Sequence, residues 1–275
     1  MSTVTASSAR EHRVTVRSLA NRKAKGRPIT MLTAYDFTFA RIFDQAGIDL
    51  LLVGDSLGNV VQGEDTTLPV TLDEVIYHTR MVVRGVSRSL VVGDMPFGSY
   101  HVSPEDAVRG AIRLVKEGGA QAVKLEGGVT MAPTIKRIVE AQMPVMGHVG
   151  LTPQSVNKMG GFRVQGRGDE GRMQVIEDAL AVQEAGAFAC VLEGIPAELG
   201  REVTERLDIP TIGIGAGVDC DGQVLVMHDM LGLNDWTPSF VKQYANLGAA
   251  ASQAARAFAD EVGHRKFPDE EHSYE

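Results

Sequence analysis

The chain has 275 residues, a formal net charge of −8 at pH 7 and a hydrophobic fraction of 44%. A chain of this length is long for a single β-sandwich and close to the roughly 250 residues of a typical (β/α)8 barrel. The excess of acidic side chains argues against a nucleic-acid-binding protein, which normally presents a basic face, and agrees with ordinary solubility.

Cysteine usage, apolar runs and N-terminal composition bear on the cellular compartment. Cys190 and Cys220 lack the spacing of a zinc site, and two cysteines in a chain of this length do not make a disulfide scaffold. No apolar stretch approaches the roughly 18 residues of a transmembrane helix. Residues 1–13 lack the apolar centre of a secretory signal. Their composition would also suit a transit peptide, but a flexible N-terminal tail is the commoner outcome. We therefore expect a cytoplasmic protein.

Short apolar runs alternate with longer stretches of helical periodicity along the chain. This alternation is typical of βαβ units and predicts a parallel sheet. The runs lie near residues 29–35, 50–55, 90–94, 121–126, 144–148, 188–193, 210–214 and 223–228. Eight is the strand number of the (β/α)8 barrel. We predict an α/β fold, a single-domain (β/α)8 TIM barrel over residues 14–263, with a flexible charged C-terminal tail at 264–275.

Helix signals separate the apolar runs. Thr71 and Glu74 have the spacing of a capping box. Pro104 follows Ser103 and is suited to the first position of a second helix, which ends at two glycines. Residues 170–186 have the pattern of a third helix. The Ala-rich residues 238–262 predict a final helix, part of which could pack on a neighbouring subunit.

One polar, glycine-rich segment, residues 152–171, interrupts this pattern. Connections of this length without secondary structure are usually functional lids or disordered segments. The segment follows the fifth predicted strand, so it would lie at the C-terminal face of the barrel, where barrel enzymes have their active sites.

Three of the apolar runs end on a carboxylate at a turn: Asp55, Asp94 and Glu126. An acid at the tip of a buried strand costs free energy unless something pairs with it. Each aspartate could instead cap the following helix. However, the tips of successive strands converge in a barrel, and clustered carboxylate oxygens suit a hard divalent cation such as Mg²⁺. We predict a metal site formed by these three residues.

Three further polar side chains lie at predicted strand ends. Lys124 and Glu126 are two residues apart and share the inner face; they could form a structural ion pair or bind a substrate carboxylate. Glu193 follows an apolar run with no evident cation beside it, which suits a general base as well as a surface acid. His148 is a weaker candidate, because such a histidine is more often a satisfied core residue.

A glycine-rich stretch follows the seventh predicted strand, Gly213-Ile214-Gly215-Ala216-Gly217. It does not match the G-x-G-x-x-G nucleotide fingerprint. We expect a tight turn in which the backbone approaches a ligand closely.

Seven motifs closely resemble those of the ketopantoate hydroxymethyltransferase (3-methyl-2-oxobutanoate hydroxymethyltransferase) family. They follow the family's order from about residue 14 to about residue 245, and only the two ends of the chain are unmatched. The motifs are Thr33-Ala34-Tyr35-Asp36, Val53-Gly54-Asp55-Ser56-Leu57-Gly58, Asp94-Met95-Pro96-Phe97-Gly98-Ser99-Tyr100, Val123-Lys124-Leu125-Glu126-Gly127-Gly128, Gly147-His148-Val149-Gly150-Leu151-Thr152-Pro153-Gln154, Leu192-Glu193 and Ile212-Gly213-Ile214-Gly215-Ala216-Gly217.

The resemblance implies a (β/α)8 barrel in the broad superfamily of phosphoenolpyruvate mutase and isocitrate lyase. It implies an Mg²⁺-dependent enzyme that transfers a hydroxymethyl group from 5,10-methylenetetrahydrofolate to 3-methyl-2-oxobutanoate. The product is 2-dehydropantoate, on the pathway of pantothenate biosynthesis. Family members are usually homo-oligomers, often decamers, and the resemblance implies no nucleic-acid or membrane partner.

The resemblance also implies roles for individual residues. Asp55 and Asp94 would bind the metal directly and Glu126 would complete its shell. Asp55, Asp94, Ser56 and Lys124 would contact the oxo acid. The proton acceptor would be Glu193.

Two other functions are compatible with the strand-end carboxylates. One is an Mg²⁺-dependent C–C lyase or mutase of the same superfamily acting on another 2-oxo acid. Such enzymes usually have a cysteine in the mobile loop, and residues 152–171 contain none. The other is a barrel that binds an oxo acid without catalysis.

Overall fold

The computed structural model describes residues 13–274 of the chain. They belong to two compact units, Met1–Val224 and Leu225–Glu275, and each unit is described by itself. The predicted division into a barrel domain at 14–263 and two flexible tails stays a prediction. Residues 1–12, nearly all of the predicted N-terminal tail, lie outside the described residues.

Eight parallel strands close into a barrel in chain order, which confirms the predicted (β/α)8 TIM barrel. Every predicted apolar run overlaps one of these strands; β5 ends two residues after its predicted run, and β8 begins one residue before its own. The strands are β1 (Ile29–Thr33), β2 (Leu50–Val53), β3 (Leu90–Asp94), β4 (Ala122–Lys124), β5 (Val145–Gly150), β6 (Ala189–Glu193), β7 (Thr211–Ile214) and β8 (Gly222–Leu225).

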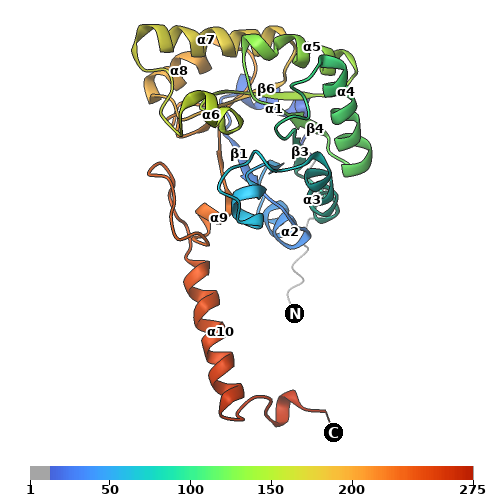
Figure 1. The fold of residues 1–275 in the computed structure, drawn as a ribbon, viewed down its shortest axis with the longest axis vertical. Coiled ribbons are helices and arrows are strands. Elements are labelled where there is room, and N and C mark those ends of the chain that lie inside the picture. Colours follow the sequence, from blue (N-terminus) through green and yellow to red (C-terminus); the bar gives the residue numbers. More distant parts are fainter. Residues whose placement is uncertain (1–12, 275) are drawn as a thin grey trace, which may run out of the picture. The chain divides into compact units, whose positions relative to one another are not determined.

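Helices connect the successive strands from β1 to β7, whereas a turn without a helix joins β7 to β8. Figure 1 shows α3, α4, α5, α7 and α8 on the outside of the strands. The α-helices are α1 (Val16–Ala24), α2 (Phe37–Gln45), α3 (Leu72–Gly85), α4 (Pro104–Arg113), α5 (Ala132–Glu140), α6 (Val156–Met159), α7 (Gly168–Glu184), α8 (Ala197–Arg206), α9 (Met227–Met230) and α10 (Leu247–Gly263). Shorter 3-10 or π-helical turns are η1 (Gly58–Gln62), η2 (Leu114–Gly118), η3 (Val129–Met131), η4 (Pro153–Ser155) and η5 (Glu270–His272). Within the described residues, no helix is both long and apolar enough to cross a membrane.

The predicted helix starts are confirmed by their capping contacts. Thr71 caps α3 in a capping box with Glu74, so two otherwise unpaired backbone N–H groups find acceptors. Ser103 caps α4, and Pro104 is its first residue. After α4 and η2 the chain turns at Gly119, whose φ of 81° is a conformation that glycine adopts without strain.

Two predicted segments differ from the structure. Residues 152–171 are not a structureless loop, because η4 and α6 form directly after β5 and α7 begins at Gly168. The final helix begins at Leu247 rather than at residue 238, because Asn246 caps it by accepting a hydrogen bond from the Ala249 backbone. The residues from 238 to 246 are instead turns and extended chain.

The apolar core inside the barrel is built from every second residue of the strands. Its strand members are Ile29, Met31, Leu50, Leu52, Leu90, Val92, Ala122, Met146, Ala189, Val191, Ile212 and Val224. On β3, Asp94 lies two residues after Val92, and on β6, Glu193 lies two residues after Val191. The alternation that fills the core therefore also directs these two carboxylates toward the barrel interior at the carboxyl ends of the strands.

Asp44, near the end of α2, connects this helix to the segment before β3. Its carboxylate accepts hydrogen bonds from the backbone N–H groups of Ser87, Arg88 and Ser89 at 2.7–3.0 Å. Burial alone would raise the pKa of Asp44, but the hydrogen bonds from Ser89 and Ser87 outweigh it and lower the pKa to about 2.

Replacing Asp44 with Ala is expected to lower the free energy of unfolding at pH 7 by about 2–3 kcal/mol, because buried N–H groups lose their acceptor. The native pKa lies below the roughly 3.9 of an unfolded aspartate, so this stabilisation is complete above about pH 5 and is lost as the pH falls toward 2. Urea denaturation at pH 7 and pH 3 measures the difference. An equal difference at both pH values would contradict this role, and Asp73→Ala, at an exposed ion pair, is the control.

Candidate active site

Five strands deliver polar side chains to one end of the barrel. Three of them are the last residues of their strands: Asp94 of β3, Lys124 of β4 and Glu193 of β6. Asp55 lies two residues after β2, and Glu126 lies two residues after β4. His148 lies within β5. The pairing register places Asp94 beside Lys124, and it places Gly150 of β5 beside Glu193. The predicted site residues therefore meet at the carboxyl ends of the strands, where barrel enzymes have their active sites.

Three of these side chains form a buried acidic cluster with one lysine. Asp55, Asp94 and Glu126 are at most 5% exposed, and Lys124 is 4% exposed. The Lys124 ammonium donates to both carboxylate oxygens of Asp94, at 2.7 and 2.9 Å, and lies 3.8 Å from Glu126 Oε1. The backbone N–H of Asp55 donates to Asp94 Oδ2 at 3.3 Å.

The pKa values of the cluster reflect an excess of buried negative charge. Burial raises the pKa of Asp55 well above its usual value, and repulsion from Asp94 and Glu126 adds to the effect. Burial also raises the pKa of Asp94, against the opposing influence of Lys124. For Lys124, burial would lower the pKa, but the three carboxylates outweigh it and raise the pKa. For Glu126, burial would raise the pKa, but His148 and Lys124 outweigh it and lower the pKa. The two cations therefore stabilise Glu126, whereas the pKa values of Asp55 and Asp94 stay raised.

This donor set fits a small hard cation. Carboxylate oxygens are the ligands that Mg²⁺ prefers, and Mg²⁺ typically takes one or two protein carboxylates while keeping water or substrate oxygens. In the described part of the chain, no three His, Cys, Asp or Glu side chains form a ready-made metal cage. Two carboxylates completed by water or substrate oxygens match the usual donor set of Mg²⁺.

Gln154 joins this cluster, although the sequence analysis gave it no role. It is 4% exposed, and its side-chain amide donates to Asp55 Oδ2 at 2.9 Å. Its backbone N–H donates to Glu126 Oε2 at 3.0 Å. The signal that could have found it is its place in a motif directly after the fifth strand, where a polar side chain can reach the barrel mouth.

His148 lies between the acidic cluster and Glu193. Its Nδ1 is 3.5 Å from Glu126 Oε1 and its Nε2 is 3.1 Å from Glu193 Oε2, which are ion-pair distances rather than well-aligned hydrogen bonds. Burial would lower the pKa of His148, but the two carboxylates outweigh it and raise the pKa to about 9. A charged imidazole thus connects the two predicted functional glutamates.

Glu193 and Ser56 are more accessible than the acids of the cluster. The Glu193 side chain is 17% exposed, so it lies where a substrate atom can approach. The Ser56 hydroxyl shares a hydrogen bond of 2.8 Å with the Tyr35 hydroxyl, and its residue directly follows Asp55 in the chain.

In the turn after β7, Gly217 packs closely against α8. A Cβ atom at Gly217, whose φ is +86°, would lie 2.6 Å from the Cβ of Ala197 in α8. A Cβ atom at Gly200 would lie 2.1 Å from the Ala216 carbonyl oxygen. The turn is therefore tight because it packs against a helix, and the expected close approach to a ligand stays a prediction.

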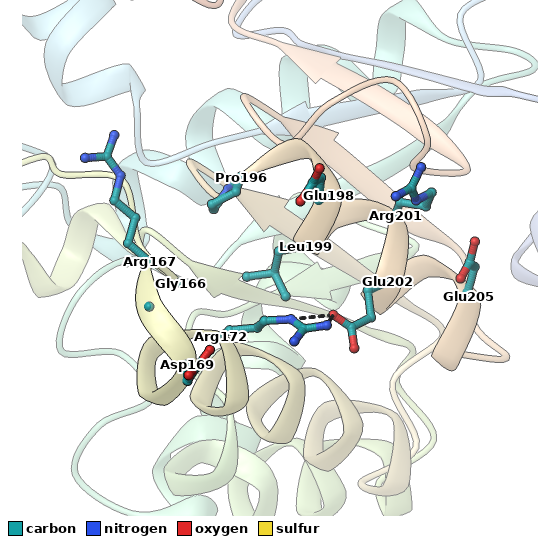
Figure 2. A pocket seen from close by; sticks show the side chains of 11 residues that line it. Gly166, Arg167, Asp169, Arg172, Pro196, Glu198, Leu199, Arg201, Glu202 and Glu205 are labelled. Carbon is teal, nitrogen blue, oxygen red and sulfur yellow. Dashed lines mark hydrogen bonds and ion pairs between the residues drawn. The ribbon is translucent and has the colours of Figure 1, made fainter.

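A cavity of about 620 Å³ lies at the N-terminal ends of α7 and α8 (Figure 2). Its lining includes Arg167, Arg172, Glu198, Arg201 and Glu202. Arg172 and Glu202 pair across it, as Figure 2 shows. None of the predicted site residues lines this cavity, and its mixed charges largely neutralise one another.

The closed parallel barrel and the polar cluster at its carboxyl end together define the class of (β/α)8-barrel enzymes. Solved structures with this fold include phosphonopyruvate hydrolase in complex with oxalate and Mg²⁺ (TM-score 0.61, 13% identity, 94% of this chain and 93% of that chain). Another is 2,3-dimethylmalate lyase, a phosphoenolpyruvate mutase/isocitrate lyase superfamily member (TM-score 0.61, 17% identity, 94% and 89%). Identities this low show the fold alone.

The sequence comparisons define the family. The model of the family ketopantoate hydroxymethyltransferase matches residues 13–270. Similar proteins include the 3-methyl-2-oxobutanoate hydroxymethyltransferases of Moorella thermoacetica, 57% identical over 97% of this chain and 99% of the relative, and of Syntrophotalea carbinolica, 56% identical over 96% and 99%. The chain belongs to the ketopantoate hydroxymethyltransferase family.

Replacing Lys124 with Met is expected to lower the free energy of unfolding by about 3–5 kcal/mol at pH 8, because Asp94 and its neighbours lose their buried counter-charge. The loss should be smaller at pH 5, because carboxyls with raised pKa values can take up protons instead. Urea denaturation at both pH values measures it. The control is Lys136→Met, at an exposed pair with Glu140, and equal losses for both variants would contradict the role of Lys124.

Proposed function

We propose that the chain transfers a hydroxymethyl group from 5,10-methylenetetrahydrofolate to 3-methyl-2-oxobutanoate and releases 2-dehydropantoate. This is a reaction of pantothenate biosynthesis, and one water supplies the new hydroxyl oxygen. The support is the match to named relatives over almost the whole chain, combined with one observation: every residue that the family resemblance assigns to the metal or to proton transfer meets at one barrel mouth.

The proposal includes Mg²⁺ held by Asp55 and Asp94, with Glu126 completing its shell. The support is the group of three buried carboxylates, of which Asp55 and Asp94 keep raised pKa values although Lys124 lies beside them, and the preference of Mg²⁺ for oxygen donors. When bound, the ion supplies positive charge that stabilises negative charge developing on the keto oxygen of the substrate.

Lys124 is proposed to hold the oxo acid and to share in this stabilisation. Its ammonium is buried, and burial alone would lower its pKa. The neighbouring carboxylates outweigh this effect and raise the pKa, so Lys124 stays charged at neutral pH. A fixed charge in a site that excludes water acts more strongly than the same charge in solvent. Asp55, Asp94 and Ser56 are proposed to complete the contacts with the oxo acid.

Glu193 is proposed as the base that removes the proton from C3 of the oxo acid. The carbon left with the electron pair then attacks the one-carbon unit of the folate. Both carbon–nitrogen bonds that hold this unit break, and one water adds its hydroxyl group to the transferred carbon. The proton taken from C3 and the second proton of the water end on the two nitrogens, which releases tetrahydrofolate. Glu193 is partly exposed and lies 3.1 Å from His148 Nε2, so its carboxylate is oriented while one side remains open to substrate. Residues 152–171 are proposed to cover the site during the reaction and to keep out bulk solvent, apart from the one water that the reaction consumes.

We also propose that the chain forms a homo-oligomer, which the family resemblance suggests is a decamer, and that it is located in the cytoplasm. Large apolar side chains exposed on α2 and α3, namely Phe37, Ile42 and Tyr77, support association with other copies. Exposed apolar side chains that gather on one surface often belong to an interface.

The reaction itself is tested by measuring tetrahydrofolate release from the purified chain with 3-methyl-2-oxobutanoate and 5,10-methylenetetrahydrofolate. We expect release that stops with EDTA and returns with added Mg²⁺. Asp55→Ala and Asp94→Ala should weaken Mg²⁺ binding in calorimetric titrations. Release that needs no oxo acid would refute the reaction, whereas release that survives exhaustive chelation would refute only the metal assignment.

Replacing Glu193 with Gln is expected to slow exchange of the C3 hydrogen of 3-methyl-2-oxobutanoate with deuterium by roughly 10²–10⁴-fold, the usual scale for a lost general base. NMR in D2O follows this exchange without any folate. Binding of Mg²⁺ should be retained, because Glu193 contributes no proposed metal contact. Exchange at the wild-type rate would remove Glu193 from this role.

A further inference from the structure

Gln154 is the most fully hydrogen-bonded side chain next to the acidic cluster. It lies in η4, one turn after β5, and is 4% exposed. Its amide nitrogen donates to Asp55 Oδ2 at 2.9 Å and to the Met95 carbonyl oxygen at 3.1 Å. Its amide oxygen accepts from the Tyr100 hydroxyl at 2.7 Å. Both amide hydrogens are therefore used, and the oxygen also has a partner.

The chemistry of the neighbours fixes which way this amide points. Two of its contacts, the Asp55 carboxylate and the Met95 carbonyl, are acceptors only. A flipped amide would place its oxygen against both, which is repulsive, so the nitrogen must face them. Tyr100 can then donate to the amide oxygen while its own oxygen accepts from the Glu126 backbone N–H at 3.2 Å.

The same residue also holds a second carboxylate. The Gln154 backbone N–H donates to Glu126 Oε2 at 3.0 Å. One residue therefore fixes one oxygen each of Asp55 and Glu126, and Tyr100 fixes the residue from the other side. Because these contacts are buried, the two carboxylates cannot rotate without leaving a donor unsatisfied.

We propose that Gln154, with Tyr100 behind it, is a positioning residue that sets the affinity of the acidic cluster for a divalent cation. It occupies Oδ2 of Asp55 and Oε2 of Glu126, which leaves the other oxygen of Asp55 for the cation. This inference rests on the proposed metal site and deepens it. It assigns a function to the Thr152-Pro153-Gln154 motif, for which neither the barrel fold nor the proposed catalytic residues account.

Gln154 also connects the segment after β5 to the acidic cluster. Gln154 lies at the start of residues 152–171, so the first turn of this segment is fastened to two carboxylates that come from β2 and β4. The metal contacts and the position of the segment are therefore set by the same residue.

The test is binding of Mn²⁺ to the purified full chain, in the absence of substrates, measured from the loss of the free Mn²⁺ signal in electron paramagnetic resonance. Mn²⁺ accepts the same oxygen ligands as Mg²⁺. Gln154→Met keeps the size of the side chain and removes both donors. We expect it to weaken Mn²⁺ binding about 10- to 100-fold, the usual effect of removing a group that orients metal ligands.

Gln183→Met is the matched control. Gln183 lies in α7, and its amide oxygen accepts from the backbone N–H groups of Asp208 and Ile209. Its replacement also removes hydrogen bonds of a partly buried glutamine, but at a place away from the carboxylates. We expect lower thermal stability with unchanged Mn²⁺ affinity, which separates a local effect on the site from a general loss of stability.

Tyr100→Phe provides a milder variant in case Gln154→Met does not fold. It removes the donor that fixes the amide oxygen and is expected to weaken Mn²⁺ binding less than Gln154→Met does. In the double variant the two losses should not multiply, because Tyr100 acts largely through Gln154.

The outcomes distinguish this inference from the proposed function. If the wild-type chain binds no Mn²⁺, the proposed metal site fails. If the wild type binds Mn²⁺ and Gln154→Met and Tyr100→Phe bind it as tightly as Gln183→Met, the metal site stands and the positioning role is overturned.

Discussion

The candidate site depends on one electrostatic constraint: three carboxylates share a buried space with one lysine. Removing each ion from water costs several kcal/mol, and only close pairing offsets that cost. Lys124 satisfies both oxygens of Asp94 but reaches Glu126 only at 3.8 Å, and the pKa of Asp55 is raised by its burial and then by its acidic neighbours. Even with the His148 imidazole 3.5 Å from Glu126, the pKa values of Asp55 and Asp94 stay raised, so the cluster is not a balanced ion pair.

The surrounding hydrogen bonds show how the fold keeps such a cluster in place. Gln154 donates hydrogen bonds to Asp55 and Glu126, and its acceptor neighbours fix the orientation of its amide. His148 lies between Glu126 and Glu193. Charge and orientation are thus supplied by different residues: Lys124 reduces the net charge, whereas the amide and the imidazole determine where the oxygens point. This division leaves a buried acidic centre next to a more accessible carboxylate, that of Glu193.

Much of this could be predicted from the sequence because the physical signals were local. Eight apolar runs indicated the barrel, and the capping box at Thr71 indicated a helix start. Acids that end apolar strands, such as Asp94, indicated which side chains lie together at the barrel mouth; their roles stay a prediction. The positions of Gln154 and Tyr100 directly after strands place them near the barrel mouth, but their roles depend on hydrogen-bond partners that lie far away in the chain, which the sequence does not show. The start of α10 was wrong because helical composition extended past residue 238, whereas the actual boundary depends on the cap at Asn246.

The shared inner face of the barrel has a consequence for how the chain can change over evolutionary time. Val92 and Asp94 point the same way because they are two residues apart on β3. Inserting or deleting one residue between them would turn the carboxylate outward and leave a hydrophobic side chain at the mouth. Insertions and deletions should therefore be tolerated only in the connections between strands. Within a strand, a change by one residue would move the functional side chain from the inner face of the barrel to the outer face.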